Sequence, residues 1–318
     1  MSKVTKLVVA LLTLGPLAAG AQTYPAKSIR MIVPFAPGGG VDFMARLLGQ
    51  KLAEPLGQQI IIDNRPGAGG TVGVEIGAKS AADGYTLTMI SSSYPVSPSL
   101  YKLSFDPIAD ITPVILVAKT PFMVVVNPSL PVKTLKELIA LAKSRPGQVT
   151  FGSSGAGSGV HLATELFQLR AGIKMNHIPY KGVGPAVVDA MAGQIALLFG
   201  SVPATLPHVK SGRLRGIAVT SAQRAAADLS IPTIAETVPG YEVLDWDALI
   251  GPKGIPPEVV ARINVEVKKI ITQKDVEERL LQDGLSGGGG TPAQLLEMIR
   301  TEMEMWRKVI ADAGIKIN

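Results

Sequence analysis

Two glycine-rich segments are the parts of this sequence best suited to contact a small anion. Residues 34–42 read Pro-Phe-Ala-Pro-Gly-Gly-Gly-Val-Asp, and residues 152–159 read Gly-Ser-Ser-Gly-Ala-Gly-Ser-Gly. Each follows an apolar run typical of a strand and precedes a helical pattern. Glycines let backbone N–H groups approach a ligand, and the helix N-terminus behind them carries about half a positive charge. As a pair they predict a cleft that holds an anion from two sides, although either one alone is equally well explained as a tight turn.

Neither segment matches a catalytic or nucleotide-binding motif. The first lacks the Gly-Lys-Ser/Thr ending of a P-loop, and neither has the spacing of a dinucleotide fingerprint. No serine of the second segment meets the Gly-x-Ser-x-Gly spacing of a nucleophile elbow. Asp42 lies in the first turn of the helix expected after the first segment and could cap it. His161 opens the helix after the second, where it could donate to a ligand, cap the helix or pack.

Other small or polar residues lie where strands of the expected sheets end, and ligands of α/β proteins bind at that edge. Ser91 and Ser92 take this position in the first half of the chain, and Gly200 and Ser201 take it in the second. Tyr180 ends another strand, where it can hydrogen-bond or stack on a solute, or only form part of the rim. The ligand-binding residues predicted from all these patterns are Phe35, Ala36, Pro37, Gly38, Gly39, Asp42, Ser91, Ser92, Ser153, Ser154, Gly155, Ala156, Gly157, Ser158, His161, Tyr180, Gly200 and Ser201.

The histidines and cysteines give no sign of a metal site. His161, His177 and His208 form no His-Glu-x-x-His motif and no close pair. The chain has no cysteine, which removes disulfides, zinc–thiolate sites and thiol nucleophiles. We therefore expect no metal, no cofactor and no catalytic residue. A hydrolase or isomerase that uses Ser154, His161 and Asp189 is the alternative from another class, because one sequence does not show which residues meet in space.

Residues 1–21 have the layout of a cleavable signal peptide. Two lysines precede a stretch of apolar or small residues, and Ala19-Gly20-Ala21 fits a cleavage site. The apolar stretch is short and is broken by Pro16, which disfavours an uncleaved membrane anchor. Because the chain has no cysteine to carry a lipid, we expect the mature protein to be free in the periplasm.

The charge of the chain argues against a nucleic-acid partner. The formal net charge is +6, and removal of the signal peptide, with two lysines and no acid, lowers it to +4. Lysines and arginines are dispersed, with no basic run that has interleaved aromatic residues. This distribution favours mild steering of anionic solutes.

Apolar runs alternate with amphipathic stretches along the whole chain, which predicts an α/β fold. The strands expected from this pattern are 29–35, 59–62, 86–90, 149–152, 177–180, 195–199 and 216–219. The helices expected are 41–54, 72–80, 134–143, 160–171, 185–193, 257–282 and 292–313, with 287–290 as a flexible joint.

A helical tail without a sheet of its own must pack on an earlier part of the chain, which predicts two lobes. The chain would cross between them near 119–127 and again near 240–247. We expect lobe 1 to comprise residues 22–123 with 246–318, and lobe 2 to comprise residues 124–245. One lobe with a long insertion would give the same pattern.

Short motifs along nearly all of the mature chain resemble a known family, the substrate-binding proteins of tripartite tricarboxylate transporters, also called Bug-type receptors. The motifs that carry the resemblance are Tyr24-Pro25, Ile29-Arg30, Val33-Pro34-Phe35-Ala36-Pro37-Gly38-Gly39 with Asp42, Asn64-Arg65-Pro66-Gly67-Ala68-Gly69-Gly70, Asp83-Gly84-Tyr85-Thr86-Leu87, Gly152 to Ser158 with His161, Tyr180-Lys181-Gly182, Pro185-Ala186, Asp189, Gly193-Gln194, Gly212-Arg213-Leu214-Arg215 and Pro232-Thr233. Each is short, and their common order makes the set specific.

The resemblance implies a periplasmic-binding-protein, or Venus-flytrap, fold and a receptor that is not an enzyme. It implies a small carboxylate ligand, such as a di- or tricarboxylate or an aromatic acid, held by backbone N–H groups of the two glycine-rich segments. It also implies a membrane permease of two unequal subunits as partner. A sensor module that presents its closed form to a signalling receptor is a further alternative. Asp245-Trp246-Asp247 departs from the family's more usual aromatic-rich sequence and could alter the hinge or the rim.

Overall fold

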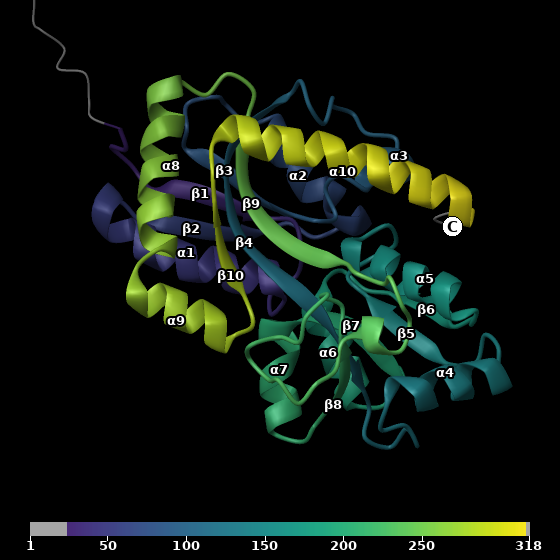
Figure 1. Cartoon of the computed structure of the whole chain (residues 1–318). Coiled ribbons are helices and arrows are strands. Elements are labelled where there is room, and N and C mark those ends of the chain that lie inside the picture. Colours follow the sequence, from purple (N-terminus) through teal and green to yellow (C-terminus); the bar gives the residue numbers. More distant parts are fainter. Residues whose placement is uncertain (1–23, 316–318) are drawn as a thin grey trace, which may run out of the picture.

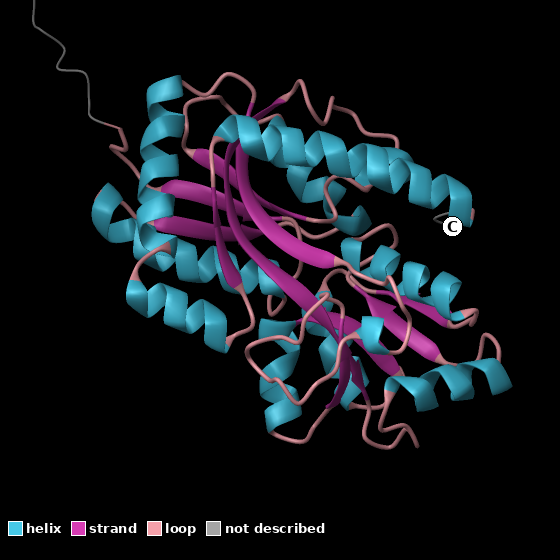
Figure 2. Cartoon of the chain, viewed as in Figure 1, coloured by secondary structure: helices cyan, strands magenta, loops and turns pink. Residues whose placement is uncertain are grey.

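The computed structural model describes residues 24–315, and the predicted signal peptide lies outside this range. Within the range, no helix is both long and apolar enough to cross a bilayer. The predicted two-lobed α/β fold is confirmed, and each lobe consists of one sheet and the helices on its faces (Figures 1 and 2).

The sheet of the first lobe has parallel strands on one side and antiparallel strands on the other. β1 pairs in parallel with β2 and β3. β9 pairs antiparallel with β3 and β4, and β10 pairs antiparallel with β4. Across the sheet the strands are β2 (Ile60–Asn64), β1 (Ile29–Val33), β3 (Thr86–Ser91), β9 (Leu244–Pro252), β4 (Ile111–Val126) and β10 (Ser286–Gly289).

The sheet of the second lobe is built onto the end of β4. β7 (Leu197–Ser201) and β8 (Arg215–Val219) both pair antiparallel with this end. β5 (Thr150–Ser153) pairs in parallel with β7 and with β6 (Asn176–Pro179). These parallel strands end at the edge that faces the first lobe, so the loops after them lie between the lobes (Figure 1).

β4 is the strand that the two sheets share. Its residues as far as Pro121 pair with β9, and Phe122 to Val126 pair with β7 and β8. The sequence did not predict this strand, because Pro113, Lys119 and Pro121 interrupt its apolar pattern. The pairing with β9 shifts register directly after Pro113, whereas Lys119 and Pro121 pair in continuous register with Trp246 and Leu244.

Helices cover the faces of both sheets. Around the first sheet are α1 (Gly40–Leu56), α2 (Thr71–Ala78), the single turn α3 (Ser97–Leu100), α8 (Pro257–Ile271), α9 (Lys274–Gln282) and α10 (Pro292–Ala313). Around the second sheet are α4 (Leu135–Ser144), α5 (Gly159–Ala171), α6 (Val183–Met191) and α7 (Val202–Lys210). Two short 3-10 turns, Ala68–Gly70 and Ile234–Glu236, complete the described elements.

Two predictions about the tail were wrong. Residues 287–290, expected as a flexible joint, belong mostly to β10, because glycines without side chains can lie directly against β4. The helix expected over 257–282 is two helices. Thr272 hydrogen-bonds through its hydroxyl to the carbonyl groups of Lys268 and Lys269, which ends α8, and the chain is extended at Gln273 before α9 begins.

α10 packs across the first lobe and reaches toward the second. Its first half buries Leu295 and Ile299 against a cluster that includes Trp246 of β9. Its second half buries Trp306 and Ile310 in a cluster that contains Val96 of the first lobe as well as the core of the second. Figure 1 shows α10, in yellow, running across the top of the first lobe toward α5. Residues of both lobes line a groove beside this helix.

Phe167 tests the core of the second lobe. It is fully buried in α5, with its ring centroid 5.7 Å from that of Phe199 and 6.3 Å from that of Tyr241. We expect Phe167→Ala to lower the free energy of unfolding by about 3–5 kcal/mol in urea titrations followed by circular dichroism. Leu169→Ala is the matched control, because Leu169 lies on the same helix and is 59% exposed. An equal loss in both variants would contradict this packing.

Candidate functional site

The loops at the facing edges of the two lobes hydrogen-bond to one another. The backbone N–H of Ala36 donates to the carbonyl of Lys181, with 2.9 Å between N and O. The Tyr101 hydroxyl donates to the carbonyl of Ala156 at 2.6 Å, and the N–H of Gly159 donates to Ser93 Oγ at 2.9 Å. These contacts join segments on either side of the gap between the sheets, so the structure is a closed form.

Glycines allow the lobes to approach this closely. A Cβ added to Gly40, the first residue of α1, would lie 2.5 Å from Ser201 Oγ of the second lobe. A Cβ added to Gly184 in α6 would overlap the carbonyl oxygen of Pro37 in the first lobe. Neither position has room for any other side chain while the lobes are closed.

A small central cavity lies between the lobes. Residues of both lobes and of the shared strands line it: Phe35, Gly39, Gly40, Val41, Ser91, Ser93, Phe122, Ser154, Val160, Val183, Ser201 and Asp245. Of the predicted site residues, Phe35, Gly39, Ser91, Ser154 and Ser201 are in this set. The lining contains no lysine, arginine or histidine, so an anion placed here would meet no cationic side chain of the lining.

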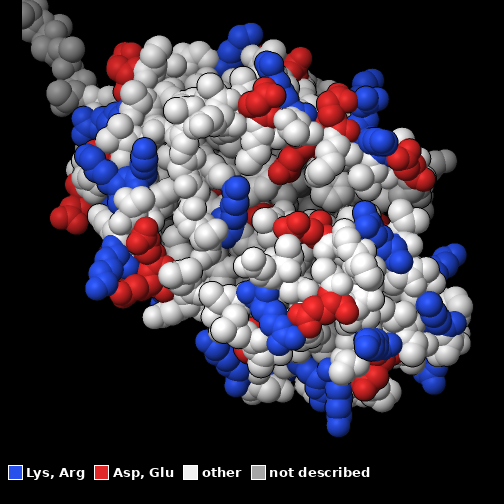
Figure 3. Space-filling model, in the orientation of Figure 1, with Lys and Arg blue, Asp and Glu red and all other residues white. Residues whose placement is uncertain are grey.

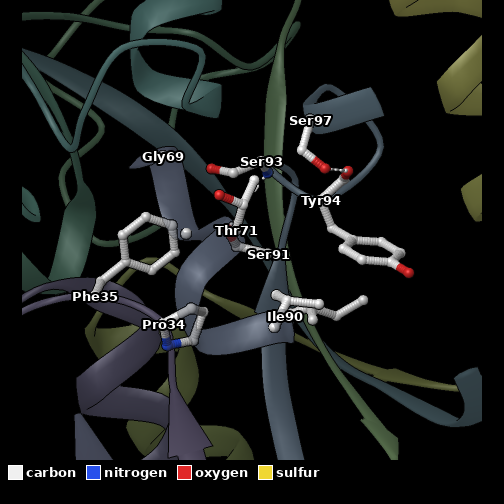
Figure 4. A pocket seen from close by; sticks show the side chains of 11 residues that line it. Pro34, Phe35, Gly69, Thr71, Ile90, Ser91, Ser93, Tyr94 and Ser97 are labelled. Atoms are coloured by element: carbon white, nitrogen blue, oxygen red, sulfur yellow. Dashed lines mark hydrogen bonds between the residues drawn. The ribbon is translucent and has the colours of Figure 1, made fainter. Parts of the chain in front are cut away.

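A smaller hollow adjoins the central cavity in the first lobe, and the two share Phe35, Ser91 and Ser93. Figure 4 shows the ring of Phe35 on one side of this hollow and the Ser91 and Ser93 side chains on the other, above Pro34 and Ile90. The Phe35 ring and the two serine side chains therefore line both the hollow and the central cavity.

Four helices begin at the central cavity. Gly40 and Val41 open α1, Val160 is the second residue of α5, Val183 opens α6 and Ser201 is the N-cap of α7. The first N–H groups of a helix have no partner within it, and together with the helix dipole they favour negative charge. The sequence predicted the ends of α1 and α5 at this site. It missed those of α6 and α7.

Asp42 supports the first loop from behind and does not line the cavity. Its carboxylate accepts hydrogen bonds from the N–H of Gly38, from Arg46 and from the Asn64 amide. Burial raises the pKa of Asp42, but these hydrogen bonds outweigh burial and hold the pKa below its usual value. Asp42 therefore stays ionised and fixes the turn, while Ala36, Pro37 and Gly38 face Lys181, Gly182 and Gly184 of the second lobe.

The second loop is held by a network inside its own lobe. Ser158 caps α5 by accepting from the N–H of His161, and His161 Nδ1 accepts from the N–H of Gly157 at 3.1 Å. The rings of His161 and His177 stack, with 3.9 Å between centroids. His177 Nε2 lies 2.6 Å from Ser153 Oγ, which in turn accepts from the N–H of Gly155. Burial and the neighbouring His161 lower the pKa of His177 to about 3, so the His177 ring is neutral near pH 7.

The remaining predicted residues lie around the cavity. Gly155, Ala156 and Tyr180 line an outer hollow between the lobes. The Tyr180 hydroxyl donates to Asp189 at 2.6 Å, and burial and this carboxylate raise its pKa to about 12. Ser92 Oγ donates to Asp245, and Gly200 packs against Thr205.

Two polar side chains are buried at the cavity. Ser201 Oγ has no hydrogen-bond partner among the described residues. Asp245 is 8% exposed, and Ser92 Oγ and the N–H of Trp246 both donate to its Oδ1. Burial raises the pKa of Asp245 to about 6. The sequence indicated only that the two acids around Trp246 could alter the hinge or the rim, and the position of Asp245 in the cavity was not predicted.

Asp247 lies two residues further along β9 and is also buried. Its Oδ1 has no hydrogen-bond partner among residues 24–315. Burial and the neighbouring Asp245 raise its pKa well above the usual range. Trp246, between the two acids, donates its indole N–H to Glu302 of α10 instead.

The residues of the enzyme hypothesis do not form a catalytic set. His161 Nδ1 is occupied by Gly157, its Nε2 lies 3.5 Å from Glu165, and Asp189 accepts from Tyr180. No hydrogen bond joins Ser154, His161 and Asp189 within the described part of the chain. That part also contains no group of three or more potential metal ligands.

A family profile described as tripartite tricarboxylate transporter family receptor matches residues 44–315. The chain belongs to this family. Members of this tricarboxylate receptor family are solute-binding receptors and not enzymes, which excludes the hydrolase or isomerase alternative.

Individual relatives match over nearly their whole length. Protein BugT of Bordetella pertussis is 42% identical over 301 residues, which are 93% of this chain and 92% of BugT. Rpa4515 of R. palustris, solved with adipate, has a TM-score of 0.89 and 36% identity over 92% of this chain and 99% of that one. MatC (Rpa3494) of Rhodopseudomonas palustris, solved with bound malate, has a TM-score of 0.86 and 29% identity over 90% of this chain and all of that one.

Asp247→Asn tests the electrostatics of this site in the folded receptor. Because the pKa of Asp247 is higher in the folded than in the unfolded chain, its stabilising effect is complete below about pH 4 and is lost as pH rises. The variant has no such proton. We expect its melting temperature to exceed that of the wild type by a few degrees near pH 7.5 and the difference to shrink toward pH 4, measured by scanning calorimetry. A difference that does not depend on pH would contradict this assignment.

Proposed function

We propose that this chain is a periplasmic receptor that closes its two lobes around a small organic carboxylate and delivers it to the membrane permease subunits of a tripartite tricarboxylate-type transporter. The observation that carries the proposal is the central cavity, which both lobes line and on which four helix N-termini converge. Adipate and malate in two relatives of similar structure support a carboxylate as the ligand.

The proposed recognition relies on neutral donors. A carboxylate in the cavity would accept from N–H groups at the starts of α1 and α6, from the N–H of Val160 in α5, and from the hydroxyls of Ser154 and Ser201. These donors must replace nearly all of the hydrogen bonds that the ligand made to water, because the ligand loses its hydration shell when the cavity closes. Figure 3 shows acidic and basic side chains interspersed on the face it displays, so the field of that face favours neither sign strongly. We infer that selection of an anion takes place inside the closed cavity.

The proposed motion uses the shared strands as a hinge. We propose the division into residues 22–123 with 246–318 and residues 124–245, which puts the second crossing where β9 pairs with β4 and the first just beyond the end of that pairing. Opening would separate the pairs Ala36–Lys181, Tyr101–Ala156 and Ser93–Gly159 and admit the ligand. In this proposal residues 1–21 direct export and are then cleaved off. Because the chain has no cysteine, the mature protein would carry no lipid on a cysteine.

Calorimetric titration with a panel of mono-, di- and tricarboxylates and aromatic acids tests the proposal directly. We expect saturable heat from at least one acid and a smaller radius of gyration by X-ray scattering when that acid is present. A folded protein that gives no saturable heat with any member of the panel would count decisively against a carboxylate receptor.

A transport assay tests delivery. We expect vesicles that contain the permease to take up the bound acid only when the receptor is present. Capture of a signalling receptor in place of the permease would favour the sensor alternative.

Gly184→Ala tests whether lobe closure produces binding. The added methyl group overlaps Pro37 only when the lobes are closed, whereas alanine suits the helix itself. We expect at least a tenfold loss of affinity, which corresponds to about 1.4 kcal/mol, with an unchanged melting temperature of the ligand-free protein.

Gly49→Ala is the control for this variant. It makes the same change within α1, where the new methyl group contacts only Ile60 and Ile62 of its own lobe. Its affinity should match that of the wild type. If Gly184→Ala binds as tightly as Gly49→Ala, closure through these loops is not required.

A further inference from the structure

The positive charge of the receptor is carried by its second lobe. Residues 124–245 hold 11 lysines and arginines against 7 aspartates and glutamates, which gives a net charge of +4. Residues 22–123 with 246–318 hold 18 of each kind and are neutral. The excess does not polarise the face that Figure 3 displays, where both signs are interspersed. An anionic partner would therefore meet its strongest attraction at a local cluster of cations on the second lobe.

Three cations surround one open hollow on this lobe. Lys136 and Lys143 of α4 and Arg170 at the end of α5 line it, together with the turn 237–239. The lining contains no acidic residue, and none of the three cations forms an ion pair within residues 24–315. All three are exposed. This basic hollow is thus suited to a negatively charged group.

Helix stability does not explain all the cations of the basic hollow. Lys143 and Arg170 lie in the last turns of α4 and α5, where a positive charge interacts favourably with the helix dipole. Lys136 is the second residue of α4, where the dipole disfavours a cation. The acid of the same turn, Glu137, accepts from the N–H of Lys133 and is therefore engaged at the helix start. Lys136 adds positive charge to the hollow although its helix does not benefit.

The basic hollow adjoins the groove beside α10, and Arg170 lines both. Both lobes contribute apolar side chains to this groove. Leu244 comes from the second lobe and is 40% exposed, and Met305 comes from α10 of the first lobe and is 49% exposed. In Figure 1 the groove lies between α10 and α5. Because its walls belong to different lobes, the groove has this shape only when the lobes are closed.

We propose that the membrane permease docks on this face of the closed receptor, with an acidic segment in the basic hollow and an apolar segment in the groove beside α10. This inference rests on the proposed receptor function and names the surface that meets the permease. Since both lobes form the groove, the permease would bind the closed, loaded receptor in preference to the open, empty one. Docking would therefore depend on the presence of the solute.

A protein segment fits this surface better than an anionic membrane does. Glu242 and Glu302 line the groove together with Lys119 and Arg170. Lipid headgroups of a single negative sign would repel these acids, whereas a folded segment can place an opposite charge against each group. The basic site is also a hollow, which a projecting side chain can enter and a flat membrane surface cannot.

A double charge reversal in the basic hollow tests the inference. In Lys136→Glu with Lys143→Glu, the new acid at the start of α4 favours the helix and the one at its end disfavours it, so stability should change little. We expect phosphatidylcholine vesicles that contain the permease to need roughly tenfold more of this variant for half-maximal uptake of the acid that the wild type binds best. The affinity for that acid in calorimetry should be unchanged, because neither lysine lines the central cavity.

Lys210→Glu with Arg213→Glu is the matched control. Both residues are exposed on the second lobe, at and just after the end of α7, and Figure 1 shows α7 well apart from α4. The double change alters the net charge of the lobe by the same amount. This variant should support uptake as the wild type does. If the two double variants behave alike, the docking inference fails and the carboxylate receptor stands.

Met305→Asp tests the groove in the same assay. We expect weaker uptake with an unchanged affinity for the acid, because the new charge would face an apolar segment of the permease. Leu281→Asp is the control, since Leu281 is 53% exposed on α9 of the same lobe. Co-sedimentation of the wild type with the vesicles should require the acid. Equal sedimentation with and without the acid would contradict a site that both lobes form.

Salt and lipid give further tests. Attraction between opposite charges weakens as salt rises, so co-sedimentation that does not change with salt would overturn the inference. Vesicles of phosphatidylcholine and phosphatidylglycerol without permease that capture the wild type, but not Lys136→Glu with Lys143→Glu, would identify the membrane as the partner instead. If an acid binds the wild type but no receptor-dependent uptake follows, delivery itself fails and the docking site fails with it.

Discussion

An anion held without a cationic side chain is the constraint on which this structure depends. Helix N-termini can hold a carboxylate only if several of them point at the same few ångströms of space, because each one contributes a fraction of a charge. In the site proposed above, this requirement would be met by α1 from one lobe and by α5, α6 and α7 from the other, since the starts of all four helices line one cavity. Parallel strands followed by helices bring these ends to one edge of each sheet, and the two edges face each other.

Bringing helix ends from two lobes together requires backbone to meet backbone. Gly40 lies against Ser201 and Gly184 against Pro37, with no room for a methyl group at either contact. Supporting residues then fix each loop from inside its own lobe. Asp42 holds the first loop with its ionised carboxylate, and the stacked His161 and His177 hold the second through hydrogen bonds within their own lobe. Each loop is therefore held in its conformation by contacts within its own lobe.

The sequence predicted what is local and missed what is formed across the chain. The glycine-rich segments at 34–42 and 152–159 stand out because composition and periodicity change together at a strand-to-helix junction. α7 was missed because its two prolines, Pro203 and Pro207, argue against a helix. Pro203 lies in the first turn, where proline is well tolerated, and Pro207 lies inside the helix.

Positions that depend on pairing between distant strands left less of a signal. β4 was missed because its prolines interrupt the apolar pattern, and the pairing with β9 that holds the strand, with a register shift after Pro113, is not visible in the sequence. In the sequence Asp245 is only an acidic residue beside a tryptophan. Because side chains alternate along β9, Asp245 lies at the cavity while Trp246 faces Glu302. In the same way, nothing local marks Gly287 and Gly288 as a strand edge.

The position of α10 has a consequence for how tightly any ligand is held. Leu295 and Ile299 are buried in the first lobe, while Trp306 and Ile310 are buried in a cluster that also contains the core of the second lobe. Opening of the lobes would expose to water whatever part of this apolar surface lies between them. Because that cost is the same for every ligand, substitutions of these side chains would change the affinity for all solutes by a similar factor and would leave the preference among solutes unchanged.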